Sequence, residues 1–337
     1  MNYQESSGRV DLVTATLHTI LLLVCISTFG GCIRRTQVAS SDSFPPELNG
    51  PIVVRVGLSR GTILEIPIED YVHGSLLAEV PLGQLPISAA HIMAEVQAVL
   101  ARTYAIANID RHSSEGYNLC ATTHCQVYRE PSPENQSVSI TASQAVQRTQ
   151  NLVLAFNGRV AQTVFHADCG GSTSASGAVW IGDTAPYLTG VTDEFCQIPT
   201  RRSWTFQIGE EELVEALNQD SRTQVGRFLT NIEVVQRDSP GRAVTIRLSG
   251  ETTKTLRGSA FRILLMRTLG QQTLKSTRFK VTRLRRSYVF EGTGHGHGVG
   301  LCQRGAMERT RAGHSASKIL SHYYPGTSLR RIRELKS

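Results

Sequence analysis

The stretch ISAAHIMAEVQAVLARTYAIANI, residues 87–109, carries the longest pattern of secondary structure in this sequence. Its apolar side chains recur at the three- and four-residue spacing of an amphipathic helix, so they fall on one helical face. That face comprises Ile92, Met93, Val96, Val99, Leu100 and Tyr104. The sequence therefore predicts a long helix with one face packed inside the protein.

Shorter patterns lie on both sides of this helix. Residues 52–67 contain two short β-like runs around a turn, and a helical stripe over 68–80 is ended by Pro81. After the long helix we expect a surface helix over 140–150 and a hairpin over 152–168, with Asn157-Gly158 at its turn.

The second half of the chain mixes the two kinds of element. Its patterns predict helices over 210–219, 301–313 and 315–324, and strands over 244–250, 279–284 and 287–292. Gly313 closes one of these helices and Pro325-Gly326 ends the last. Because helices and strands alternate irregularly, the fold class is predicted as α+β rather than a doubly wound sheet.

Composition and charge restrict the class of protein. The chain has 337 residues, 40% of them hydrophobic and 19% charged, which is typical of a globular protein of one large domain or two lobes. Its net charge of +7 suggests an anionic partner, such as a lipid surface or an acidic wall polymer. Basic residues concentrate over 282–288 and 328–335 without interleaved aromatics, which favours a solvated face over a nucleic-acid interface.

The N-terminus is typical of an exported protein. Residues 12–32, LVTATLHTILLLVCISTFGGC, form a short apolar run that ends in small residues and a cysteine. We predict a signal peptide over 1–32 of the lipoprotein type, with Cys32 lipidated, and a tether over 33–50. An uncleaved N-terminal anchor is the alternative. In both cases the folded part is expected outside the cytoplasm, membrane-anchored or secreted.

Five cysteines remain beyond the leader, and an odd number leaves at least one thiol that is free, metal-bound or paired with another chain. Cys120, His124 and Cys125 supply three corners of a tetrahedral zinc site, with His112 as the nearest fourth ligand. A Cys120–Cys125 disulfide is the alternative.

Two further cysteines, Cys169 and Cys196, flank a loop and form a candidate disulfide. Such a bond would stabilise the fold by about 3 kcal/mol. Core cysteines are the alternative.

The run GTGHGHGVGLCQRGA, residues 292–306, is rich in glycine and bears His295 and His297. It contains neither a G-x-G-x-x-G nor a P-loop pattern, so a nucleotide loop is not indicated. The two histidines lack a third ligand nearby. We expect either a backbone floor for a large ligand or a tight glycine-rich turn.

Five blocks, taken in order, resemble the SpoIID family, which comprises stage II sporulation protein D and the amidase enhancer LytB. They are EDYVHGSLLAEVP (69–81), VQAVLARTYA (96–105), CATTHCQVY (120–128), FHADCGGSTSASGAVWIGDTAPYLTGVTDEFC (165–196) and GHGHGVGLCQRGAMERTRAGHSASKILSHYYPGTSL (294–329). The resemblance implies one domain over 51–330, with two lobes around a groove for glycan strands.

The resemblance also implies an activity. Sporulation members of the family are lytic transglycosylases of peptidoglycan, and their catalytic acid matches Glu79. Glu79 would protonate the glycosidic oxygen and then, as a base, help to form a 1,6-anhydromuramyl end, a reaction that requires no cofactor. The alternative is a non-catalytic peptidoglycan-binding protein that activates a cell-wall amidase. Glu95 stands where familiar members often carry lysine, which leaves room for this alternative.

The remaining site residues follow from the same blocks. Some family members hold zinc at the block that contains Cys120 and Cys125, so a structural zinc ion is the cofactor to expect. The residues expected to contact the glycan are Arg102, Tyr104, Gly170, Gly171, Ser172, Tyr187, His295, His297 and Gln303.

Overall fold

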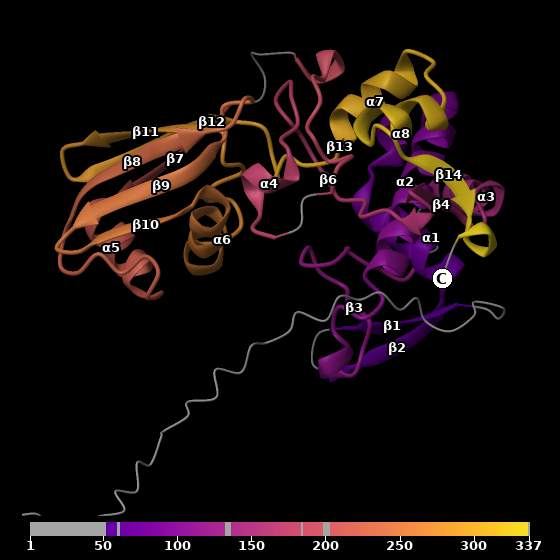
Figure 1. Cartoon of the computed structure of the whole chain (residues 1–337), viewed down its shortest axis with the longest axis horizontal. Helices are drawn as coiled ribbons and strands as arrows, with labels where there is room; N and C mark the ends of the chain where they lie inside the picture. The colour runs from indigo at the N-terminus through magenta and orange to yellow at the C-terminus, as the bar shows by residue number, and fades with distance from the viewer. Residues whose placement is uncertain (1–51, 59–60, 132–135, 183–184, 198–202, 336–337) are drawn as a thin grey trace, which may run out of the picture. The chain divides into compact units, whose positions relative to one another are not determined.

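The structure is a computed structural model that describes residues 52–58, 61–131, 136–182, 185–197 and 203–335 (Figure 1). These residues all belong to one compact unit, Ser43–Ser337. The predicted signal peptide, its Cys32 and the tether over 33–50 lie outside them. Within the described ranges, no helix has both the length and the apolar composition needed to cross a membrane.

The helix predicted over 87–109 is α2 (Ile87–Ala107), and it is the central element of the first hydrophobic core. Met93, Val96 and Leu100 of the predicted face are completely buried. The opposite faces are rich in alanine, whose small side chain lets neighbouring elements approach closely. The helices α1 (Ile68–Glu79), α3 (Gln136–Arg148), α7 (Gln303–Arg311) and α8 (Ala316–Tyr323) therefore all contact α2.

Three small sheets complete this part of the fold. In the first, β1 (Val53–Gly57) pairs with β2 (Ile63–Pro67) and β3 (Leu119–Cys120). In the second, β4 (Leu152–Phe156) pairs with β5 (Arg159–Val160) and β14 (Ser328–Arg331). The third joins β6 (Phe165–His166) in parallel to β13 (Leu301–Cys302).

The β4–β5 hairpin turns where the sequence predicted it. Asn157 and Gly158 both have positive φ angles, 51° and 81°. That backbone conformation matches the twist of a two-residue hairpin and is tolerated best by asparagine and glycine. The short asparagine-glycine signal was therefore sufficient to locate this turn.

A second hydrophobic core is formed by residues between Trp204 and Phe290. One sheet has the order β11 (Phe279–Leu284), β12 (Ser287–Thr293), β7 (Ser203–Gly209), and another has β10 (Thr253–Arg257), β9 (Ala243–Gly250), β8 (Leu229–Arg237). The helices of this part are α5 (Glu210–Asn218) and α6 (Gly258–Leu269). The strands β7, β8 and β10 and the helix α6 lie in segments for which no element was predicted. In β8 the register shifts break the regular alternation of side chains.

The chain returns from the second core to the first through the glycine-rich run, because Val299, Leu301 and Cys302 are buried in the first core. The short helix α4 (Ser176–Val179) lies in the segment that leads from the first core to the second. Ser259, at the start of α6, donates a hydrogen bond to the carbonyl oxygen of Val179 in α4. The mixed α+β class is confirmed.

Candidate functional site

Glu79 is the last residue of α1, and the chain leaves the helix at once because Val80 is extended (φ −122°, ψ 126°) and Pro81 follows. Its side chain is half-buried, and its Oε1 accepts a 2.7 Å hydrogen bond from the backbone N–H of Val127. Burial raises the pKa of the Glu79 carboxyl, and the Val127 bond offsets only part of this rise. The negative end of the helix dipole also disfavours the charged form at this position. Glu79 is thus a carboxylic acid disposed to keep its proton.

Glu79 borders a pocket of about 460 Å³, called here the Glu79 pocket. Its other lining residues include Gln84, Asp168, Trp204, Lys275, His295, Gln303 and Arg304. The side-chain amide of Gln303, the first residue of α7, donates a 3.2 Å hydrogen bond to the carbonyl oxygen of Glu79. The end of α1 and the start of α7 are therefore held together at the edge of this pocket.

His295 is the histidine of the glycine-rich run that reaches the Glu79 pocket. Its backbone forms a short antiparallel bridge with Asp168, with N–H to carbonyl distances of 2.8 and 3.0 Å. Lys275 and Arg304 also line the pocket, and Arg304 Nε lies 4.0 Å from the carboxylate of Asp168, so the lining holds both cations and carboxylates. A pocket lined by several charged and hydrogen-bonding side chains suits a polar ligand.

His297 lies elsewhere. Its Nε2 is 2.9 Å from the carbonyl oxygen of Phe165, and its ring packs against Trp180 and His166. Burial lowers the pKa of His297 to about 4, so the ring is neutral near pH 7. It is not in the lining of the Glu79 pocket, and the expected contact with the glycan is not supported for this residue.

Most of the glycines in this run serve packing of the protein on itself. A Cβ atom at Gly300 would lie 2.0 Å from the carbonyl oxygen of Val164, and one at Gly298 would lie 2.3 Å from the guanidinium of Arg242. Both residues also have positive φ angles. The close neighbour that the glycines imply is therefore, at these two positions, another part of the same chain.

Arg102 is placed differently from its prediction. The side chain is completely buried and donates hydrogen bonds from its Nε and Nη2 to the carboxylate of Glu69, at distances of 2.5 to 3.2 Å. Its Nη1 donates to the carbonyl oxygen of Leu152. Arg102 therefore joins α2 to α1 and β4 inside the core. The predicted contact with a sugar is corrected to a structural ion pair.

The other residues expected to face the glycan are also not in the lining of the Glu79 pocket. Tyr104 and Tyr187 are buried, and the Tyr187 hydroxyl accepts a 2.6 Å hydrogen bond from the backbone of Gln162. The Ser172 hydroxyl donates to the Gly171 carbonyl, and the Gly170 carbonyl accepts from Arg278. The structure thus brings only Glu79, His295 and Gln303 of the predicted set into one pocket.

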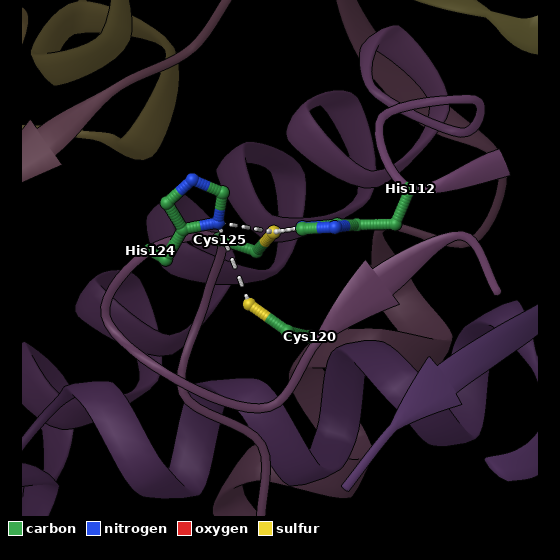
Figure 2. A group of neighbouring side chains, drawn as sticks. All are labelled: His112, Cys120, His124 and Cys125. Carbon is green, nitrogen blue, oxygen red and sulfur yellow. Dashed lines mark hydrogen bonds between the residues drawn. The ribbon is translucent and has the colours of Figure 1, made fainter. Parts of the chain in front are cut away.

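A second group of side chains, His112, Cys120, His124 and Cys125, is called here the cysteine–histidine cluster (Figure 2). Its four potential ligand atoms all lie within 4.8 Å of one another. Cys125 Sγ is 3.3 Å from His112 Nε2 and 3.7 Å from His124 Nδ1, and Cys120 Sγ is 3.7 Å from the same His124 atom. Cys120 and Cys125 are free thiols, so the structure does not contain the alternative disulfide.

The surroundings of this cluster fit a metal ion. His112 Nδ1 lies 2.5 Å from the Glu115 carboxylate, which leaves Nε2 directed toward Cys125. A carboxylate on the far nitrogen is the usual partner of a metal-bound histidine because it fixes the ring and its tautomer. Two cysteines and two histidines form a common donor set for structural zinc. His112, the nearest fourth ligand in the sequence, completes the set.

The cysteine–histidine cluster and Glu79 are connected through one loop. Val127, which donates to the Glu79 carboxylate, is only two residues beyond Cys125. On the same segment, Gln126 accepts a hydrogen bond from the Tyr71 hydroxyl of α1, and Tyr128 stacks on the Tyr71 ring. A metal ion that fixes this loop would therefore also fix the carboxyl group of Glu79. No local signal in the sequence indicated the role of Val127.

The predicted Cys169–Cys196 disulfide is not formed. Cys169 is a free thiol whose Sγ lies 3.5 Å from the carboxylate of Asp193. Both cysteines are buried, as in the alternative of core cysteines.

Comparison with known proteins identifies the family. The family described as stage II sporulation protein (SpoIID) matches residues 59–156, and a domain of unknown function matches residues 200–300. An uncharacterised protein of Brachyspira hyodysenteriae is 31% identical over 266 residues, which cover 79% of this chain and 67% of that protein. The chain belongs to the SpoIID family.

Other relatives carry functional names. The amidase enhancer of Bacillus subtilis is 27% identical over 294 residues, which cover 73% of this chain but only 39% of that longer protein. The stage II sporulation protein D of the same organism is 27% identical over 284 residues, covering 80% of this chain and 76% of that protein.

Proposed function

We propose that this protein is a lytic transglycosylase that cleaves the glycan strands of peptidoglycan, with Glu79 as general acid and then general base. Family membership and the names of the relatives support a role at the cell wall. The observation that carries the proposal is the half-buried Glu79 carboxyl of raised pKa at the edge of a pocket lined by polar and charged side chains.

The first step needs a protonated acid. Burial favours the neutral form of Glu79, so the side chain can donate its proton to the oxygen of the scissile glycosidic bond as that bond breaks. The Val127 N–H then stabilises the carboxylate that forms, because it already points at Oε1. Burial thus raises the pKa of Glu79 and the hydrogen bond lowers it, which suits a group that must both release and regain a proton.

The second step uses the same side chain as a base. The Glu79 carboxylate removes the proton of the C6 hydroxyl of the muramyl sugar while that oxygen attacks the anomeric carbon. The products are a 1,6-anhydromuramyl end, the released chain and a reprotonated Glu79. Because the nucleophile belongs to the substrate, a second carboxylate to activate water is not required, in contrast to hydrolytic glycosidases.

The other residues of the pocket position the strand in this proposal. Lys275 supplies positive charge for the lactyl carboxylates of muramyl sugars that lack stem peptides, and His295 supplies a hydrogen-bonding ring. Arg304 faces Asp168 and so contributes less of its charge to a ligand. Gln303 keeps the end of α1 in place through the Glu79 carbonyl. The substrate-binding groups of this proposal come from the glycine-rich run, α7 and the segment around Lys275.

Zinc in the cysteine–histidine cluster would be held by His112, Cys120, His124 and Cys125. With four protein ligands, a zinc ion is structural and takes no part in the bond-breaking steps. Its contribution would be to hold the loop that bears Val127. In this proposal the protein is exported and anchored through Cys32, since the substrate lies outside the cytoplasm.

A non-catalytic protein that binds peptidoglycan and activates a cell-wall amidase is the second candidate, favoured by the relative named amidase enhancer. The sequence suggested that Glu95, at a position where the family often has lysine, favours this second candidate. The position of Glu95 in the structure weakens that argument. Glu95 forms a 2.7 Å ion pair with Arg148 of α3 and is not in the lining of the Glu79 pocket.

One assay separates the two candidates. Glycan strands without stem peptides are incubated with the purified protein, and mass spectrometry is used to identify the new chain ends. The enzyme yields 1,6-anhydromuramyl ends, whereas a binder retains the strands and yields no new ends. New reducing ends without the anhydro form would indicate hydrolysis and would contradict the transglycosylase.

A further inference from the structure

Three cysteines and one aspartate meet in the first hydrophobic core, at a place that the proposed reaction does not use. Cys169, Asp193, Cys196 and Cys302 are called here the three-cysteine cluster, and their potential ligand atoms all lie within 4.8 Å of one another. All four residues are buried, with exposed fractions of 0 to 2%. They come from three segments separated by up to 133 positions along the chain.

The distances suit tetrahedral coordination. Cys302 Sγ lies 3.5 Å from Cys196 Sγ, and Cys169 Sγ lies 3.5 Å from Asp193 Oδ2. Around a tetrahedral zinc ion with Zn–S bonds of about 2.3 Å, neighbouring sulfur atoms are about 3.8 Å apart. Small shifts of these side chains would therefore create four positions around one ion.

The backbone around the sulfur atoms is arranged as at thiolate sites. The N–H of Cys169 donates to Cys302 Sγ at 3.2 Å, and the N–H of Gly171 donates to Cys169 Sγ at 3.3 Å. Cys302 caps the N-terminus of α7, where its Sγ accepts the N–H of Gly305 at 3.4 Å. Hydrogen bonds of this kind stabilise the negative charge of metal-bound sulfur.

The aspartate is oriented by partners of its own. The Tyr323 hydroxyl donates a 2.7 Å hydrogen bond to Asp193 Oδ2, and Arg309 lies 3.4 Å from Oδ1. A Cβ atom at position 305 would lie 1.9 Å from Asp193 Oδ2, so glycine there allows the carboxylate to reach the start of α7. Ligating carboxylates are commonly held by such outer hydrogen bonds.

We propose that the three-cysteine cluster is a second zinc site of this protein, with Cys169, Cys196, Cys302 and Asp193 as ligands. Three soft sulfur donors and one carboxylate select a thiophilic cation such as Zn²⁺ over Mg²⁺ or Ca²⁺. On binding, three S–Zn bonds form and the three thiol protons are released to solvent, including the one that Cys196 now directs at Asp168. No change of oxidation state is involved.

The consequence of this site is structural. Cys169 follows Asp168, and Cys302 precedes Gln303, and both of these neighbours line the Glu79 pocket. Zinc would tie the segment after β6 to the start of α7, and so fix one wall of the pocket. The inference does not rest on the reaction proposed for Glu79, because it concerns metal content alone.

Metal content tests the proposal directly. The full-length protein, purified with a reductant, is loaded with Zn²⁺, freed of excess ion, and measured by inductively coupled plasma mass spectrometry. The Cys120→Ser/Cys125→Ser variant, which lacks the cysteine–histidine cluster, is expected to retain one zinc per chain. Adding Cys169→Ser and Cys302→Ser is expected to remove that zinc. A double variant that binds no zinc would overturn the proposal.

Two further measurements guard against a variant that fails to fold. Cobalt bound to the Cys120→Ser/Cys125→Ser variant is expected to show an intense thiolate-to-cobalt charge-transfer band, and its absence would contradict sulfur ligation. Tyr323→Phe keeps the ring but removes the bond to Asp193, and we expect about tenfold weaker Zn²⁺ affinity in the same variant background. An unchanged affinity would contradict ligation by Asp193. A Cys169–Cys196 disulfide found by mass spectrometry in the protein isolated without reductant would also overturn the proposal.

Discussion

The backbone N–H of Val127 donates a 2.7 Å hydrogen bond to the Oε1 of Glu79, although the two residues are 48 positions apart. Val127 belongs to the loop of the cysteine–histidine cluster, and Glu79 is the last residue of α1. This single bond connects a candidate metal site to a candidate catalytic acid. The loop with the candidate metal ligands is thus connected to a residue that borders the Glu79 pocket.

Loss of the metal at the cysteine–histidine cluster should therefore reduce activity by way of Glu79. We expect Cys120→Ser/Cys125→Ser to lower the rate of strand cleavage at least tenfold, because the loop no longer holds Val127 against the carboxyl group. The rate is measured by release of anhydromuramyl products. Thr123→Ala, an exposed substitution in the same loop, is the matched control and should keep the wild-type rate. Equal rates of strand cleavage in the two variants would show that the cysteine–histidine cluster does not affect catalysis.

The raised pKa of Glu79 predicts a dependence of stability on pH. The folded protein holds the Glu79 proton to a higher pH than the unfolded chain does, so this group stabilises the fold at low pH and loses that contribution as pH rises through the folded pKa. Glu79→Gln removes this dependence and retains an oxygen to accept the Val127 N–H. The melting temperature of the variant minus that of wild type should therefore increase as the pH is raised from 4 to 7. A difference that stays constant over this range, or that reverses, would contradict the raised pKa.

Arg102 should prove structural. Arg102→Ala leaves the Glu69 carboxylate without its buried partner and is expected to cost about 3–5 kcal/mol in the free energy of unfolding, measured by urea denaturation. The matched control is Arg148→Ala, whose ion pair with Glu95 is exposed and should contribute less than about 1 kcal/mol. A small loss of stability for Arg102→Ala, together with loss of glycan binding, would restore the original prediction of a sugar contact.

Gln303 should act on the position of Glu79 with little effect on overall stability. Gln303→Ala removes one hydrogen bond to the Glu79 carbonyl, worth about 1 kcal/mol. We expect a lower kcat with a nearly unchanged melting temperature, because the end of α1 gains freedom while the core is intact. Gln303→Glu, which cannot donate when ionised, should behave in the same way. A wild-type kcat in both variants would exclude this role.

The sequence was sufficient where a feature depends on neighbouring residues. The buried face of α2 and the turn at Asn157-Gly158 follow from local spacing and backbone preference, and both were predicted. The order of the blocks identified the family, and Glu79 as the catalytic acid stays a prediction from that resemblance. These signals lie within one element each, or in the order of short motifs along the chain.

The sequence failed where a feature depends on packing between distant segments. Arg102 lies off the predicted apolar face of α2, yet it is buried because α1 supplies Glu69 and β4 supplies the Leu152 carbonyl. Cys302 joins Cys169 from 133 positions away, so spacing alone favoured a disulfide with Cys196. Gln303 meets Glu79 across 224 positions. No periodicity within a single element indicates such contacts.

The central claim, that Glu79 is the proton donor, is tested most directly by comparing two glutamine variants on peptide-free glycan strands. Glu79→Gln should form 1,6-anhydromuramyl ends at least a hundredfold more slowly than wild type, because an amide cannot donate the required proton. Glu95→Gln, at a glutamate outside the pocket, should retain the wild-type rate. Anhydro ends formed by Glu79→Gln at the wild-type rate would contradict the account.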